Sequence, residues 1–135
     1  MTLPEFVCKA LRVPFVARGR DWSGLDCWGL VRLAHAEVLG VQLPSYLESY
    51  VAADVRGTEA LGDLIVANLP GWNRVEMPMP MDVALFLIHG RPVHVALVID
   101  SRRALHTEAK VGTFVERLDS PMWLKRLEGV YRHAR

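Results

Sequence analysis

Three side chains in this sequence could act together as a nucleophile and its partners: Cys27, His94 and His106. Cys27 follows a glycine-containing loop, at the point where an amphipathic helix is predicted to begin. The free N–H groups and partial positive charge of a helix N-terminus favour a thiolate, so we expect a lowered thiol pKa and a nucleophilic sulfur. Asp26 is the expected N-cap of this helix, with Ser23 a weaker candidate. The alternative is that Cys27 is a small buried hydrophobic residue.

The two histidines are predicted to meet on one face of a sheet. His94 interrupts an apolar strand, 93–99, and His106 lies in the next strand, 104–107. A three-residue turn would place the rings diagonally on one face, with Cα atoms about 7–8 Å apart. We therefore predict His94 as the base for Cys27 and His106 as the residue that orients it. An even-numbered turn would separate the rings, and either histidine could instead be a hydrogen-bonded core residue.

Other uses of these residue types are weaker hypotheses. A zinc site of Cys27, His94 and His106 is conceivable, but the sequence has no paired-ligand motif. We therefore expect neither a metal nor an organic cofactor. The remaining cysteine and histidines are expected to be structural, solvated or incidental: Cys8, His35 on the polar face of its helix, His89 and His133.

Composition limits the class of protein. The chain has 135 residues, 51% of them hydrophobic, which predicts one domain over 1–135 with a real core. The 16 basic and 15 acidic residues give a net charge of +1, so nothing indicates a nucleic-acid partner. The N-terminus lacks a basic leader, and polar residues break the longest apolar stretch, 83–99. We therefore expect synthesis in the cytoplasm without a signal peptide, and no membrane insertion.

Hydrophobic periodicity predicts the fold class. Helical patterns come first and strand patterns follow, which is typical of an α+β domain with N-terminal helices packed on an antiparallel sheet. Residues 15–24 read as a loop, and Gly40 is expected to end the second helix. The predicted helices are 6–11, 27–39 and 58–68, and the predicted strands are 82–88, 93–99, 104–107, 113–117 and 130–132.

Four motifs in order resemble the NlpC-type cell-wall cysteine peptidases. Gly24-Leu25-Asp26-Cys27-Trp28-Gly29-Leu30-Val31 is similar to that family's Asp-Cys-Ser-Gly-Leu signature. The segments 81–86 and 93–98 resemble two of its strands, and His106 lies where its third polar residue is found. The resemblance implies a papain-like fold and hydrolysis of an amide bond in peptidoglycan stem peptides, often next to a γ-linked D-glutamyl residue. It assigns Cys27 as nucleophile, His94 as base and His106 as orienter.

Three further sequence features resemble the branch of this family that is encoded by phages and gene transfer agents. They are Trp28 in place of serine, the connector Leu43-Pro44 and the closing Gly129-Val130-Tyr131-Arg132. This implies a virion component of a phage or phage-like tail, acting at the cell wall, with a tail hub or tip protein as partner. Exposed members of an apolar segment could dock it, although an ordinary connector is the simpler interpretation: Trp72, Met77, Met79 and Met81.

Two departures from the family pattern lie beside the predicted nucleophile. Phe15 stands where the family often has a tyrosine whose hydroxyl reaches the active site, so one hydrogen bond is lost unless water or Ser23 replaces it. Trp28 either narrows the substrate groove or packs its own helix. The rival functions are a structural tail protein with the same fold and little or no catalysis, or another thioester chemistry such as acyl transfer or deamidation.

Overall fold

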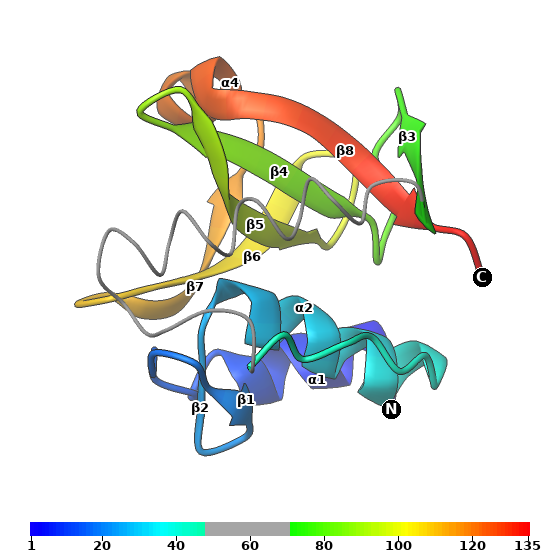
Figure 1. Cartoon of the computed structure of the whole chain (residues 1–135), viewed down its shortest axis with the longest axis vertical. Helices are drawn as coiled ribbons and strands as arrows, with labels where there is room; N and C mark the ends of the chain where they lie inside the picture. The colour runs from blue at the N-terminus through cyan, green and yellow to red at the C-terminus, as the bar shows by residue number, and fades with distance from the viewer. Residues whose placement is uncertain (48–70) are drawn as a thin grey trace.

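Residues 1–47 and 71–135 are described by the computed structural model, and they form a helical layer packed on an antiparallel sheet (Figure 1). The first third of the chain supplies the helical layer and the second half supplies the six-stranded sheet, as an α+β domain requires. The predicted helix 58–68 lies outside the described residues. In the part of the chain that the structure describes, no helix is both long and apolar enough to span a membrane.

The helical layer has two helices with well-defined starts. Helix α1 spans Leu3–Ala10, and its N-cap Thr2 exchanges hydrogen bonds with Glu5 in a capping box. Helix α2 spans Cys27–Ala34 and continues as one π-helical turn, η1, over His35–Leu39. Gly40 ends it with a φ of 68°, a left-handed conformation that glycine adopts without steric cost. The predicted end of the second helix is therefore confirmed.

The six-stranded sheet is antiparallel throughout, with spatial order β3-β8-β4-β5-β6-β7. The last strand of the chain lies between β3 and β4, so β4 has neighbours on both sides. The strands are β3 (Trp72–Val75), β4 (Val83–Ile88), β5 (Arg91–Val98), β6 (Arg103–Glu108), β7 (Gly112–Arg117) and β8 (Leu127–His133).

Both faces of this sheet are buried at its centre. The side chains that face the helical layer pack on α1 and α2, and they are Val83, Leu85, Val95, Leu97, Leu105 and Tyr131. The opposite face packs on Trp123 from helix α4, Pro121–Arg126, through Ala84, Phe86, Ala96, Val98, Ala104 and Val130. The predicted strand 82–88 is thus present as β4, and it is a central strand buried on both faces, as its continuous apolar run requires.

An ion pair between a buried carboxylate and a partly exposed guanidinium joins the start of β4 to β8. Asp82 is fully buried, and its two carboxylate oxygens accept hydrogen bonds from Nε and Nη2 of Arg132 at 2.7 and 2.9 Å. One of these oxygens also accepts from the backbone N–H of Met79, at 2.8 Å. A buried carboxylate needs such partners because desolvating an unpaired charge is costly.

Several elements differ from the sequence-based expectation. The expected loop 15–24 contains a two-stranded ribbon, β1 (Arg20–Asp21) with β2 (Gly24–Leu25). Strand β3 and helix α4 were not predicted, because each is short and has too few residues to show a period. The hairpin turn after β4 is only His89–Gly90, since β5 begins at Arg91. Both turn residues have positive φ, 53° and 79°, as a two-residue type I′ turn requires.

Gly29 provides a test of how closely α2 approaches the loop before it. A Cβ atom at Gly29 would lie 2.0 Å from the carbonyl oxygen of Gly19. Gly29→Ala should therefore lower the free energy of unfolding by about 1–3 kcal/mol, although alanine is the better helix former. Urea denaturation measures this. Gly71→Ala is the matched control, since nothing lies within 4 Å of its added Cβ. Equal stability of both variants would contradict the close approach.

Candidate active site

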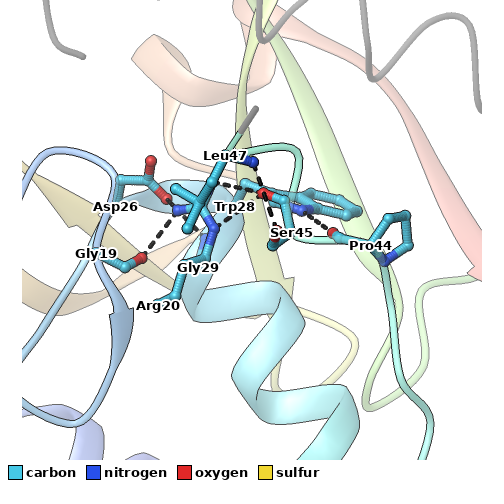
Figure 2. Close-up of polar contacts among 8 residues, drawn as sticks. All are labelled: Gly19, Arg20, Asp26, Trp28, Gly29, Pro44, Ser45 and Leu47. Carbon is cyan, nitrogen blue, oxygen red and sulfur yellow. Dashed lines mark hydrogen bonds and ion pairs between the residues drawn. The ribbon is translucent and has the colours of Figure 1, made fainter. Parts of the chain in front are cut away.

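Cys27 is the first residue of α2, and a network of buried charge fixes the turn around it (Figure 2). Asp26 is the N-cap, as predicted, and its Oδ1 accepts a hydrogen bond from the backbone N–H of Gly29 at 2.7 Å. The same oxygen lies 2.6 Å from Nη1 of Arg20, and both side chains are less than a tenth exposed. Ser23 does not cap the helix; it bonds Asp21 instead.

The connector after the helix is tied to the same network by its carbonyl groups. Arg20 donates from Nε and Nη2 to the carbonyl of Ser45, at 3.0 and 2.8 Å. Trp28 donates from Nε1 to the carbonyl of Pro44 at 2.8 Å (Figure 2). Its ring also packs against Tyr46. Trp28 is only 4% exposed. Of the two interpretations for this tryptophan, the structure supports helix packing.

The expectation of a lowered thiol pKa is wrong for Cys27. Burial raises the pKa of the thiol to about 12, and the nearby Asp26 carboxylate raises it further. The backbone of Val95, the guanidinium of Arg20 and the backbone of Trp28 act in the opposite direction but are outweighed. Desolvation disfavours the charged form more than the helix N-terminus favours it, so Cys27 carries its proton at neutral pH.

His94 and His106 meet as predicted. Nε2 of His94 lies 2.8 Å from Nδ1 of His106, and the rings stack with 7° between their planes. The pairs Leu97–Leu105 and Val98–Ala104 set the register, which is the one given by a three-residue turn. The other ring nitrogen of His94, Nδ1, takes no part in this bond.

Both imidazoles are held in an apolar pocket of the sheet. They pack on Phe86 and on Trp123 of α4, with ring centroids 4.6–5.9 Å apart. Burial lowers the pKa of His94 to about 4, helped by the nearby Arg126. Burial, and then the neighbouring His94, lower the pKa of His106 to about 3. The pair is therefore neutral at physiological pH.

Cys27 contacts the backbone of β5, at the residue that follows His94. Its sulfur faces the backbone of Val95, which follows His94 in the strand and packs towards α2. The His94 ring lies with Phe86 and Trp123 instead, and among the described residues no hydrogen bond joins the sulfur to either imidazole. The structure thus brings His94 and His106 into contact with each other and places the Cys27 sulfur at the backbone of Val95, the residue after His94.

Comparison with known proteins identifies the family. The model of the NlpC/P60 family matches residues 12–132. The chain belongs to the NlpC/P60 family. No curated protein matches it.

Solved structures share the papain-like fold of this NlpC/P60 domain at low sequence identity. A Staphylococcus aureus protein similar to a lipoprotein of the NLP/P60 family has a TM-score of 0.68 at 20% identity over 99% of this chain. The chain spans only 41% of that protein's length. The NlpC/p60 domain of the peptidoglycan hydrolase SagA has a TM-score of 0.61 at 19% identity. The P60 domain of antigen MAP1204 from M. avium subspecies paratuberculosis has a TM-score of 0.56 at 15% identity. The chain matches 94% and 96% of its own length to these two domains and covers 92% of each.

His35 does not lie on a solvated face of the NlpC/P60 domain, contrary to prediction. It is fully buried, its Nδ1 lies 2.8 Å from the carbonyl oxygen of Val31, and burial lowers its pKa to about 4. His35 follows the buried Val31 by four residues, so regular helical spacing already places it on the buried face, and the polar face assigned to it from the sequence was wrong. Trp72 of β3 and His133 of β8 pack on the ring.

The remaining predicted residues are placed as follows. Cys8 is exposed on α1, His89 is in the exposed hairpin turn, and Phe15 forms a bridge with Leu25. Within the described residues no three His, Cys, Asp or Glu side chains are grouped to hold a metal ion, so the zinc arrangement is not formed there. In the apolar segment, Met77 and Met79 are exposed, whereas Met81 is buried and Trp72 is partly buried.

Two residues of the site were missed by sequence reasoning. Arg20 pairs with Asp26 from the two-residue strand β1, which is too short to show a periodicity in the sequence. Trp123 covers both histidines, and its only signal was that tryptophan usually packs in a core.

The lowered pKa values predict acid-sensitive stability. His94, His106 and His35 stay neutral in the folded protein well below 6.5, whereas in the unfolded chain they bind protons near that pH. The unfolded state thus binds more protons below pH 6.5, so the free energy of unfolding should fall as the pH is lowered from 7 to 4.5. Each buried histidine contributes at most about 1.4 kcal/mol per pH unit.

Urea titrations at several pH values measure this slope. His35→Gln should flatten it, because one shifted histidine is removed away from Cys27. The control, His89→Gln in the exposed turn, should keep the slope of the parent. A free energy of unfolding that is constant from pH 7 to 4.5 would contradict the burial of neutral imidazoles.

Proposed function

We propose that this NlpC/P60 domain is a cysteine peptidase that hydrolyses an amide bond in the stem peptides of peptidoglycan. The observation that carries the proposal is the bond between Nε2 of His94 and Nδ1 of His106, on the strand where Cys27 meets the sheet. Membership of the family supports it, as does the likeness in fold to a domain of the peptidoglycan hydrolase SagA. The reaction needs only groups that the chain supplies.

In the first step the Cys27 sulfur attacks the amide carbonyl. Because the thiol is protonated at rest, its proton moves to Nδ1 of His94 as the S–C bond forms. For this, Nε2 of His94 must carry hydrogen and donate it to Nδ1 of His106, which fixes the tautomer. Catalytic hydrogen bonds are often long or misaligned until substrate binds, so the thiol and imidazole complete their contact in the complex.

In the second step the amide C–N bond breaks and the leaving amine takes the proton from His94. Water then attacks the thioester, gives a proton to the same nitrogen, and releases the carboxylic acid and the Cys27 thiol. Backbone N–H groups at the start of α2, including that of Cys27, hold the oxyanion in both steps. The Asp26 cap and Arg20 keep this first turn in place.

Substitution of the three residues tests the mechanism. Cys27→Ala should abolish hydrolysis of purified peptidoglycan, because no other group can form the thioester. His94→Ala should lower kcat by about 10²–10⁴-fold, the contribution of a positioned base. His106→Ala should have a smaller effect, since it removes only the orienting bond. New amino groups and new carboxyl groups, counted in equal number, measure the reaction.

Cys8→Ser and His89→Gln are the matched controls, since both residues are exposed and lie outside the site. Deamidation would release ammonia, and acyl transfer would return an amide in place of a carboxyl group. A folded parent protein without any of these products would favour a structural role. His106→Ala with the activity of the parent would show that His106 only packs.

We also propose that the chain acts at the cell wall as part of a phage or phage-like tail, held by a hub or tip protein. The support is the resemblance of Trp28, Leu43-Pro44 and the closing segment 129–132 to the phage-type branch. The exposed Met77 and Met79 are candidates for the contact.

Mass spectrometry of purified particles tests the tail assignment. The chain should be found in intact particles and should be missing from particles made after deletion of its gene. Its appearance only in the lysis supernatant would identify a free lysis enzyme instead.

A further inference from the structure

The short helix α4 places a positive charge beside the histidine pair, on the face of the sheet away from α1 and α2 (Figure 1). Trp123 and Arg126 are three residues apart, so their side chains share one side of this helix. The guanidinium carbon of Arg126 lies over the Trp123 ring, 5.8 Å from its centroid. The centroid of the same ring lies 5.6 Å from that of His94 and 4.6 Å from that of His106. Trp123 thus holds a cation next to the ring stack that contains both imidazoles.

This guanidinium keeps its full charge. Arg126 is exposed, and in the part of the chain that the structure describes it forms no ion pair. Its charge acts on Glu108, which lies two residues after His106 in β6. Burial raises the pKa of the Glu108 carboxyl, the charge of Arg126 lowers it, and Glu116 raises it again. The field of Arg126 therefore reaches the strands that carry the histidines.

The groups packed around the His94 ring are uncharged at physiological pH. Phe86 of β4 and Trp123 of α4 cover the ring, and His106 of β6 is neutral because its pKa is lowered to about 3. At the backbone of β5, the Cys27 thiol carries its proton. None of these groups balances a positive charge on His94, so the neutral imidazole is favoured.

Arg126 adds a positive charge where a catalytic triad of the Ser-His-Asp kind has a negative one. In such a triad the carboxylate stabilises the imidazolium that forms. Here the third position is His106, whose buried Nε2 has no hydrogen-bond partner among the described residues. Burial, and then the charge of Arg126, lower the pKa of His94 to about 4. The surroundings of His94 are thus those of a weak base.

We propose that Arg126, held over Trp123, acts on His94 through its charge and keeps this base unprotonated in mild acid, ready to accept the Cys27 proton. The inference rests on the proposed function, in which that proton passes from the sulfur to Nδ1 of His94 and then to the amine nitrogen as the C–N bond breaks. The same charge makes protonated His94 a stronger donor to the leaving amine. Arg126 is therefore a positioning residue, which acts only through the base.

A series of charges at position 126 tests this without turnover. In the Cys27→Ala protein, the ring C–H resonances of His94, identified by their loss in His94→Gln, report its protonated fraction. The fraction is compared at the lowest pH at which circular dichroism shows every variant folded. Arg126→Gln should raise it about two- to fivefold at low salt, as expected for the loss of one exposed charge interaction. Arg126→Glu should raise it further, and Arg126→Lys should keep the fraction of the parent.

Two controls separate charge from packing. Lys125→Gln removes the neighbouring exposed cation of α4 and should give the protonated fraction of the parent. High salt should shrink the differences within the series, because it screens an exposed charge. Arg126→Lys with the behaviour of Arg126→Gln would show that stacking of the guanidinium matters and its charge does not, which would overturn the inference.

The pH dependence of kcat/KM on peptidoglycan is the second measurement, made with Cys27 present. Its acid limb should move to higher pH in the order Arg126→Lys, Arg126→Gln, Arg126→Glu, because each step lets His94 bind its proton more readily. A His94 protonation that ignores the charge at position 126 would overturn the inference whatever the activity. Protonation that follows this charge in a protein without hydrolysis would overturn the proposed catalysis and leave the effect of Arg126 on His94 standing.

Discussion

The buried ion pair between Arg20 and Asp26 holds the start of α2, and the rest of the site is arranged around it. One carboxylate oxygen accepts from the guanidinium and from the first turn of the helix, while the guanidinium also reaches the carbonyls of Gly19 and Ser45. Loop, helix and connector are thus joined through one cation. Removing either partner would leave a buried charge unpaired, which costs far more than the pair itself contributes. The position of Cys27 is therefore set by residues that do no chemistry.

Burial also determines the protonation state of the thiol and of the two imidazoles. Thiol and imidazoles are all desolvated, so the charged form of each is disfavoured and the resting site is neutral. In the proposed mechanism, charge separates between the sulfur and His94 only when substrate is present, and the oxyanion donors and the bond to His106 are what would stabilise it. Trp123 and Phe86 contribute by keeping water away from the imidazoles.

The sequence predicted those parts of the site that depend on residues close together in the chain, and it failed for those that depend on distant strands. The helix start at Cys27, the Asp26 cap and the strand register of His94 and His106 follow from spacing and turn length, and all three were confirmed. The predicted direction of the Cys27 pKa shift and the predicted exposure of His35 were wrong, because each depends on which distant strand covers the residue. Neither Arg20 nor strand β3 lies in a segment with a recognisable helical or strand periodicity of hydrophobic residues. Only the folded chain shows what they contact.

The position of β8 has a consequence for the order of folding during synthesis. Leu127–His133 pairs with both β3 and β4, so this sheet is completed by the last of its described strands to be synthesised. Until then β4 has one open edge, β3 has no partner among the described strands, and Asp82 lacks the guanidinium of Arg132. The helical layer and the β4–β7 meander can form from local contacts, but the surface of β4 under α2 lacks Tyr131. The nascent chain therefore carries all three site residues before it has the scaffold that holds them.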